Sequence, residues 1–210
     1  MDKAKTIYIY YAVLFAIKFT SGENPCLSKT TQCLCSNDRV DCSNGNITAI
    51  PSKFPSGTKQ MNLFENNISY IESKTFSSMP ALEDIILNNN RIRELLPLTF
   101  LELESLYDIY LENNQLSVIH PRAFEKLPKL GRIYLAGNRL HCTCAIKWFV
   151  AYLNGNPNLF NRTSASCSSP TTVVQKKVAL LNASNLQCVL VGSLLALFFL
   201  LFTYAALKGR

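Results

Sequence analysis

Histidine is scarce in this chain, with only His120 and His141 among its 210 residues. The first precedes Pro121 and the second precedes Cys142. No nucleophile motif, phosphate-binding loop or paired metal motif accompanies either of them. Catalysis needs such a constellation of groups to bind and activate a substrate. We therefore predict that the protein is not an enzyme and that it holds no cofactor and no metal.

Clusters of basic residues are also missing, although the formal net charge is +7. Five of the 21 lysines and arginines lie in the terminal segments, together with one of the 14 acidic residues, which leaves 16 basic and 13 acidic side chains between residues 23 and 188. This middle part shows no run or stripe of Lys and Arg, which is the usual electrostatic pattern of a nucleic-acid-binding protein. We expect no nucleic-acid partner.

A first apolar run lies close to the N-terminus. Lys3 and Lys5 precede the run, which extends from Ile7 to Ile17, and small residues follow at Thr20 and Gly22, where a signal peptidase reads. The 11 residues of this run are too few to cross a bilayer. The pattern predicts a signal peptide over residues 1–22, cleaved after Gly22, and entry of the remaining chain into an oxidising compartment.

A second apolar run extends from Val189 to Leu207, with 19 uncharged residues followed by Lys208 and Arg210. At about 1.5 Å per residue it approaches the thickness of a bilayer core, and trailing cations suit the cytoplasmic side. We predict a transmembrane helix at 189–207 and a cytoplasmic tail at 208–210. The protein would then be a single-pass type I protein of the plasma membrane that faces the cell exterior. The alternative is a lipid anchor attached near Asn182, with the apolar run discarded.

Between these runs, leucine returns every 24 residues at Leu63, Leu87, Leu111 and Leu135. Three further columns keep the same step: Met61, Ile85, Ile109 and Ile133; Asn66, Asn90, Asn114 and Asn138; and Phe76, Phe100 and Phe124. Apolar residues two apart face one side of a strand, the asparagines can satisfy backbone groups of the adjacent turn, and the phenylalanines fill the convex side of the core. The period predicts an α/β solenoid, a short curved horseshoe with parallel strands on its concave face.

Eight cysteines form two sets of four that bracket the repeats. The first set is Cys26, Cys33, Cys35 and Cys42, and the second is Cys142, Cys144, Cys167 and Cys188. The end coils of a solenoid expose their apolar core, so we expect disulfide-tied caps at both ends. Zinc bound by His141, Cys142 and Cys144 is the alternative, but C-x-C differs from the C-x-x-C spacing of common zinc sites. Sequons at Asn46, Asn67, Asn161 and Asn182 predict N-glycosylation.

The cysteine spacing is C-x6-C-x-C-x6-C before the repeats, and C-x-C followed by Trp148 after them. With these flanks, residues 26 to 188 resemble the extracellular leucine-rich repeat family, including Nogo-receptor-like proteins, variable lymphocyte receptors and the small subunits of the platelet glycoprotein Ib/IX complex. The resemblance implies bonds between Cys26 and Cys35, Cys33 and Cys42, Cys142 and Cys167, and Cys144 and Cys188. The spacing alone leaves three pairings open in each set. The resemblance also implies caps over 23–57 and 141–188 and about four repeats over 58–140.

The residues that flank each buried strand position are expected to project from the concave face. They are Gln60, Asn62 and Phe64; Asp84, Ile86 and Asn88; Asp108, Tyr110 and Glu112; and Arg132 and Tyr134. The middle column is largely apolar and aromatic, which is unusual on open surface and typical of protein interfaces. Asp84, Asp108 and Glu112 add acidity. We predict that a protein or glycan ligand of basic character binds across these strands.

Three classes of function follow from these features. The first is a cell-surface protein that binds a ligand through its concave face in recognition or adhesion. The second is a single-pass accessory subunit of a receptor or channel complex, which contacts a lateral partner through residues 189–207. The third is a lipid-anchored antigen receptor similar to variable lymphocyte receptors, although no Thr/Pro-rich stalk lies between Cys167 and Val189.

Overall fold

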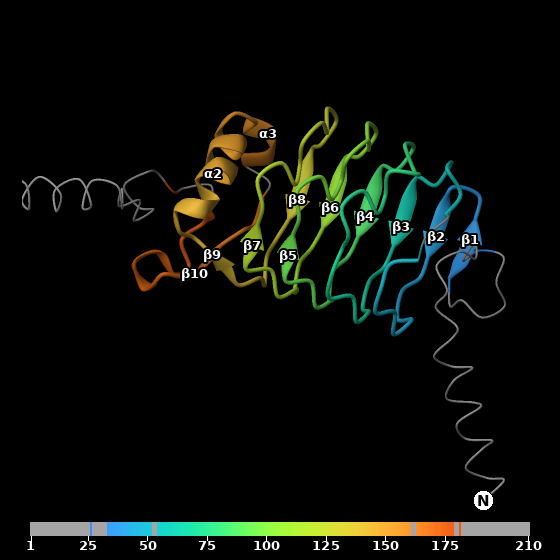
Figure 1. Cartoon of the computed structure of the whole chain (residues 1–210), viewed down its shortest axis with the longest axis horizontal. Coiled ribbons are helices and arrows are strands. Elements are labelled where there is room, and N and C mark those ends of the chain that lie inside the picture. Colours follow the sequence, from blue (N-terminus) through green and yellow to red (C-terminus); the bar gives the residue numbers. More distant parts are fainter. Residues whose placement is uncertain (1–25, 27–32, 52–53, 161–162, 179–180, 182–210) are drawn as a thin grey trace, which may run out of the picture.

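The computed structural model describes residues 26, 33–51, 54–160, 163–178 and 181, and in this part of the chain one sheet has six strands in the order β1, β2, β3, β4, β6, β8. The strands are β1 (Leu34–Ser36), β2 (Arg39–Asp41), β3 (Gln60–Asn62), β4 (Asp84–Ile86), β6 (Asp108–Tyr110) and β8 (Arg132–Tyr134). β1 and β2 form an antiparallel hairpin, and the other strands continue in parallel from β2. Figure 1 shows these strands side by side along the long axis of an elongated stack of coils. The predicted solenoid is confirmed.

The register of the sheet repeats the 24-residue step of the sequence. Met61 pairs with Ile85, and Ile85 pairs in turn with Ile109, and all three side chains are fully buried. The leucine two residues after each of them is buried as well, whereas the residue between is only half-buried. Successive side chains of a strand point to opposite faces. The same alternation therefore buries one face of the sheet and leaves the concave face accessible.

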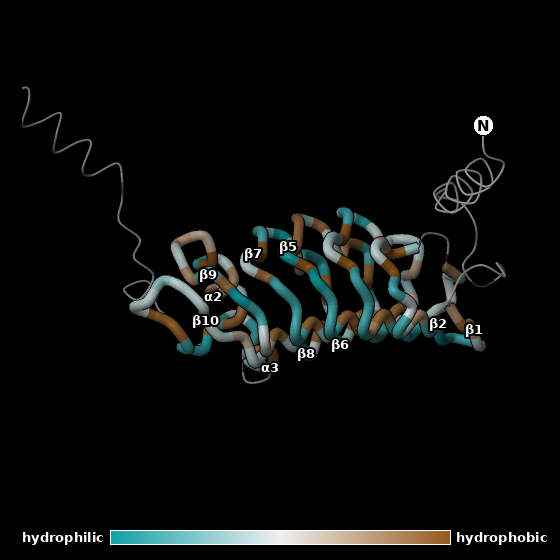
Figure 2. Tube along the Cα trace, turned by 90° about the horizontal axis from the view of Figure 1, so that it is seen from below, coloured by the Kyte–Doolittle hydropathy of each residue, from teal (hydrophilic) through white to brown (hydrophobic). Residues whose placement is uncertain are grey.

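Phenylalanines stack on the convex side of the core, as predicted. The rings of Phe76, Phe100 and Phe124 are buried and nearly parallel, with successive centroids 5.9 Å apart. A smaller parallel sheet of β5 (Glu94–Leu95) and β7 (Val118–Ile119) lies on the path from the main sheet to this column. Figure 2 shows β5 and β7 at the edge of the stack opposite to β6 and β8. Each coil thus buries apolar groups on several sides of one continuous core.

The asparagine column satisfies backbone groups where the chain leaves the sheet. Asn90 donates to the carbonyl oxygens of Leu63 and Leu87 at 2.9 and 3.0 Å, and its own side-chain oxygen accepts from the Ile68 N–H at 3.0 Å. Asn114 makes the equivalent three bonds one coil later. A buried peptide group without a partner is destabilising, so each asparagine joins two coils. The predicted structural role of this column is confirmed.

The N-terminal cap covers the first coil with the β1–β2 hairpin. Cys26 is bonded to Cys35 and Cys33 to Cys42, which are the pairs that the resemblance implies. Val40 of β2 is buried and lies in register with Met61 of β3. The apolar face of the first repeat is therefore covered by the cap instead of by water.

The C-terminal cap contains two α-helices, two short 3-10 helices (labelled η) and two short strands within the described residues. Its elements are β9 (Leu140–His141), η2 (Cys144–Ile146), α2 (Lys147–Asn154), α3 (Pro157–Phe160), β10 (Cys167–Ser169) and η3 (Thr171–Val173). Phe149 of α2 extends the phenylalanine column, with its ring centroid 5.6 Å from that of Phe124. Cys142 is bonded to Cys167, which ties β9 to β10. Cys144 is also disulfide-bonded, and its predicted partner Cys188 lies outside the described residues.

Other predictions also fall outside the residues that the structure describes. They are the signal peptide at 1–22, the transmembrane helix at 189–207 with its lipid-anchor alternative, the tail at 208–210, and the sequons at Asn161 and Asn182. Among the described residues, no helix has both the length and the apolar character that crossing a bilayer requires.

Candidate functional site

The concave face is built from two ladders of side chains that continue from strand to strand. The first ladder is Arg39, Gln60, Asp84, Asp108 and Arg132, and the second is Asp41, Asn62, Ile86, Tyr110 and Tyr134. Phe64, Asn88 and Glu112 follow the strands in the next outward position. The structure thus brings the predicted concave residues together, and strand β2 adds Arg39 and Asp41, which the prediction omitted. Arg39 and Asp41 flank the buried Val40 in the same way that Gln60 and Asn62 flank Met61. This pattern in the sequence could have identified them as concave residues.

The C-terminal half of the concave face is aromatic. The rings of Tyr110 and Tyr134 are stacked, with centroids 4.7 Å apart and planes inclined by 10°. The Arg132 guanidinium lies 5.4 Å from the ring centroid of Tyr107 and 5.9 Å from that of Tyr134. Tyr107, which directly precedes β6, is 42% exposed and was not predicted. Tyrosine and arginine are enriched among the residues that dominate protein interfaces. We call Tyr107, Tyr110, Arg132 and Tyr134 the aromatic cluster.

Gly131 makes room for the ring of Tyr107. A Cβ atom at this glycine would lie 2.6 Å from two ring carbons of Tyr107, which is far inside van der Waals contact. The equivalent positions in the earlier coils are occupied by Lys59, Glu83 and Tyr107 itself. The missing side chain in this one coil therefore lets the Tyr107 ring lie against the next coil, beside Arg132.

Asp108 does not supply free negative charge to this surface. Its side chain is almost completely buried, and both carboxylate oxygens accept hydrogen bonds from the Arg132 guanidinium on the next strand. The Tyr110 hydroxyl donates to the same carboxylate at 3.1 Å. A paired contact of this kind satisfies the carboxylate and fixes the orientation of the arginine. The expectation that Asp108 adds acidity for a basic ligand is therefore wrong, because an arginine in register neutralises it.

The electrostatic environment shifts the pKa values of two members of the cluster, Tyr110 and Arg132. Burial, followed by the charge of Asp108, raises the pKa of Tyr110 to about 12. The hydrogen bond from Arg132 to Asp108 raises the pKa of the guanidinium above its usual range. Tyr110 is consequently a neutral phenol and Arg132 a cation throughout the neutral pH range.

Acidity remains at Asp84 and Glu112. The Gln60 amide donates to Asp84 at 3.2 Å, and the Asn88 amide donates to Glu112 at 2.8 Å. Burial raises the pKa of the Glu112 carboxyl. The side-chain oxygen of Asn88 is buried and has no hydrogen-bond partner among the described residues.

The N-terminal end of the face is polar. Asp41 lies at the end of the second ladder and is exposed. The backbone N–H of Ser43 donates to its carboxylate at 2.9 Å and is the main cause of its lowered pKa. The concave face therefore runs from a polar end at the N-terminal cap, which carries Arg39 and Asp41, to an aromatic end that carries Arg132.

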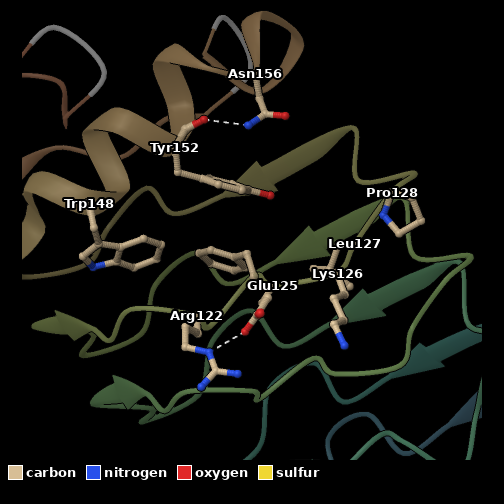
Figure 3. A pocket seen from close by; sticks show the side chains of 9 residues that line it. Arg122, Glu125, Lys126, Leu127, Pro128, Trp148, Tyr152 and Asn156 are labelled. Atoms are coloured by element: carbon tan, nitrogen blue, oxygen red, sulfur yellow. Dashed lines mark hydrogen bonds and ion pairs between the residues drawn. The ribbon is translucent and has the colours of Figure 1, made fainter.

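A hollow also lies on the convex side, between α2 and the turn of the last repeat (Figure 3). It has a volume of about 440 Å³ and is lined by Arg122, Phe124, Glu125, Lys126, Leu127, Pro128, Trp148, Tyr152 and Asn156. Trp148 and Tyr152 contact Phe124 with ring centroids 6.5 and 6.1 Å apart, and burial raises the pKa of Tyr152. These contacts attach the cap to the last repeat. We therefore assign this hollow to cap packing.

The remaining predicted sites lie elsewhere. Asn46 is exposed and Asn67 is half-buried, and both are in the first coils, away from the aromatic cluster. The described residues include no group of three or more His, Cys, Asp or Glu side chains placed to hold a metal ion. The zinc alternative at Cys142 and Cys144 is wrong, because both residues are in disulfides.

Comparison with known proteins agrees with this architecture. Residues 81–140 match the family described as Leucine rich repeat. The chain is 33% identical over 73 residues to human leucine-rich repeats and immunoglobulin-like domains protein 1, a match that covers 35% of this chain and 7% of that protein. It is 28% identical over 97 residues to leucine-rich repeat-containing G-protein coupled receptor 5 of Xenopus tropicalis, which covers 43% and 11% of the two chains. A third relative, leucine-rich repeat-containing protein 4 of Rattus norvegicus, is 40% identical over 53 residues, or 24% and 8%.

Residues 81–140 are thus similar to leucine-rich repeats, and the structure places them in a solenoid with disulfide-bonded caps at both ends. The chain spans only a small fraction of the length of the relatives it matches. Repeat solenoids of this class present their concave surface for protein interaction. The prediction that the chain is not an enzyme agrees with its similarity to leucine-rich repeat proteins.

Proposed function

We propose that this protein acts at the cell surface in recognition or adhesion, and that it binds a protein ligand through the aromatic cluster of its concave face. The observation that supports this most strongly is the ordered contact among Tyr110, Tyr134 and Arg132 on an otherwise accessible face. Such groups have no packing role in the core. Because Arg132 is already fixed by Asp108, a ligand immobilises few further side chains when it binds.

The chemistry of the face favours a ligand with an apolar or aromatic centre and a basic group beside it. The stacked rings of Tyr110 and Tyr134 suit the apolar part. Asp84 and Glu112 suit the basic part, since Asp108 is neutralised. A glycan with a flat apolar sugar face is the second ligand type that these rings can hold.

The size of the face limits the affinity. The parallel strands are about 4.8 Å apart, so the five strands from β2 to β8 span on the order of 20 Å. A typical stable interface buries about 800 Å² on each partner. We therefore expect either modest affinity or an additional contact on the C-terminal cap.

The cell-surface location rests on the predicted signal peptide and the predicted span at 189–207. One relative is by name a G-protein coupled receptor, which supports a plasma-membrane setting. The roles of accessory subunit and of lipid-anchored receptor both depend on residues outside the described part of the chain. Phosphatidylinositol-specific phospholipase C, applied to intact cells that express the full chain, separates the two modes of attachment: release indicates a lipid anchor and retention indicates a transmembrane helix.

The ligand-binding proposal is tested by displaying the full chain on cultured cells and screening it against a library of soluble extracellular proteins. Each binder is then tested against Tyr110→Ala and Tyr134→Ala, with Tyr70→Ala as the matched control, because Tyr70 is an exposed tyrosine away from the concave face. We expect at least a tenfold loss of affinity for the two cluster variants, which is typical of a dominant interface residue. Equal binding by all the variants would refute the proposed site.

A further inference from the structure

A second surface lies on the flank where each coil passes from the main sheet towards β5 and β7. In three consecutive coils, the buried residues Ile92, Leu116 and Leu140 mark the centre of this crossing. Each is flanked by two outward residues: Arg91 and Arg93, then Gln115 and Ser117, then Arg139 and His141. Figure 2 shows this flank as largely hydrophilic segments that lead from β6 and β8 to the opposite edge.

Backbone hydrogen bonds hold these residues in register. The N–H of Gln115 donates to Ile92 at 3.0 Å, and that of Arg139 donates to Leu116 at 2.9 Å. One position further along, Ser117 donates to Arg93 at 2.9 Å and His141 to Ser117 at 3.0 Å. The first pair of outward residues lies two coils away from the last pair. At the usual spacing of strands this is a distance of about 10 Å. We call Arg91, Arg93, Arg139 and His141 the basic flank.

The charge of the basic flank is not neutralised by the described residues. Its three arginines are exposed, and none of them belongs to an ion pair found in the described part of the chain. The acidic residue next to Arg93 is Glu94, whose carboxylate is paired with His120 at 2.8 Å. The flank therefore presents three uncompensated guanidinium groups on one side of the molecule.

We infer that the basic flank binds a linear sulfated polysaccharide of the heparin class. A guanidinium group donates two parallel hydrogen bonds to an anionic oxygen pair, which suits sulfate and phosphate alike. Gln115 and Ser117 lie between the arginines and provide neutral hydrogen-bonding groups along the same line. An anionic chain that repeats its charges matches cations repeated along a solenoid.

The absence of Phe, Tyr and Trp from the basic flank argues against a nucleic acid as the occupant. Single-stranded nucleic acids are held by aromatic side chains on which the bases stack, together with cations along the backbone. None of the six outward residues of this flank is Phe, Tyr or Trp, and His141 supplies the single ring among them. A polysaccharide needs only the cations and the neutral donors. Since this surface is separate from the concave face, the proposal does not depend on the concave ligand.

The test uses the full chain, purified in mild detergent, and immobilised heparin as the probe. The variant Arg91→Gln/Arg93→Gln/Arg139→Gln removes the three cations of the flank. The matched control, Lys74→Gln/Lys126→Gln/Lys129→Gln, removes the same charge from exposed positions on the turns around the phenylalanine column. Thermal unfolding of both variants shows whether the fold is intact, and these surface changes are expected to leave it so.

We expect the flank variant to bind heparin at least about tenfold more weakly than the unmodified chain and to elute at lower salt, because fewer counterions are displaced. The control variant should lose less than about threefold. Desulfated heparin and a single-stranded oligonucleotide of similar length should bind more weakly than heparin. Equal losses in the two variants, or an oligonucleotide that binds as tightly as heparin, would overturn the inference.

Discussion

At the scale of single residues, Arg132 connects the two properties of the concave face. Its guanidinium is paired with the buried carboxylate of Asp108 and also lies over the rings of Tyr107 and Tyr134. The pair keeps a carboxylate satisfied below the surface while the cation keeps the rings in place. Stability and the proposed ligand recognition therefore depend on the same side chain.

Removing this arginine should destabilise the fold. We expect Arg132→Ala to lower the free energy of unfolding by about 2 kcal/mol, because it leaves the Asp108 carboxylate buried without its cation, in a pair that remains partly solvated. The double variant Asp108→Asn/Arg132→Ala should recover part of this loss. Urea denaturation followed by circular dichroism measures both effects, and an Arg132→Ala variant as stable as the unmodified protein would show that the pair is not buried as described.

The raised pKa of Tyr110 predicts a loss of stability in alkali. Its folded pKa of about 12 exceeds the ordinary value of 10.0, so the unfolded chain releases this proton first. The stabilisation is fully present below pH 10 and is lost as the pH rises from 10 towards 12. Tyr110→Phe cannot ionise and should lose less stability over this window. Urea midpoints of the two proteins at pH 8 and pH 11 provide the measurement, and parallel declines would contradict the assignment.

At the scale of the repeat, the asparagine column joins each coil to its neighbours. Asn114→Ala should lower the free energy of unfolding by about 1–3 kcal/mol, because the change leaves the buried Ile92 N–H without its acceptor and removes one of the two donors to the Leu87 carbonyl. Gln115→Ala is the control, since it changes the next residue without touching these groups. Thermal unfolding is the measurement. A control that is as unstable as Asn114→Ala would show that the loss does not come from the side-chain bonds.

The repeat pattern made these elements predictable from the sequence, whereas contacts between coils were not. Each column of the period fixes the environment of a residue within its own coil, so the strands, the asparagines and the phenylalanines could be assigned. The burial of Asp108 depends on Arg132, which lies 24 positions later, and the place of Tyr107 depends on the glycine at 131. The basic flank was missed for the same reason, since Arg91 and Arg139 come together only when the coils stack.

At the scale of the whole molecule, the disulfide-bonded caps close the core. The bonds from Cys26 to Cys35 and from Cys33 to Cys42 span the same sequence separation of 9 residues, so their effects on the unfolded chain should be similar, about 2–3 kcal/mol. Cys33 and Cys42 are buried, whereas Cys35 is exposed. We therefore expect Cys33→Ala/Cys42→Ala to reduce the melting temperature more than Cys26→Ala/Cys35→Ala. An equal reduction would show that packing beneath the cap adds nothing.

The two surfaces of the solenoid are proposed to bind different ligands. The concave face presents ordered rings and Arg132 to a specific ligand, and the basic flank presents arginines to a repeated anion. Because these surfaces lie on different sides of the same coils, both can be occupied together. A polysaccharide bound on the flank would hold the molecule near other cell surfaces without covering the aromatic cluster.

Site-specific photo-crosslinking tests the concave-face claim most directly. A benzoylphenylalanine photoprobe replaces Tyr134 in one form of the full chain and the exposed Tyr70 in another, and both are displayed on living cells in the presence of a binder from the screen. Covalent attachment of the binder through position 134 and its absence at position 70 is the predicted result. Attachment through position 70 alone would contradict the account.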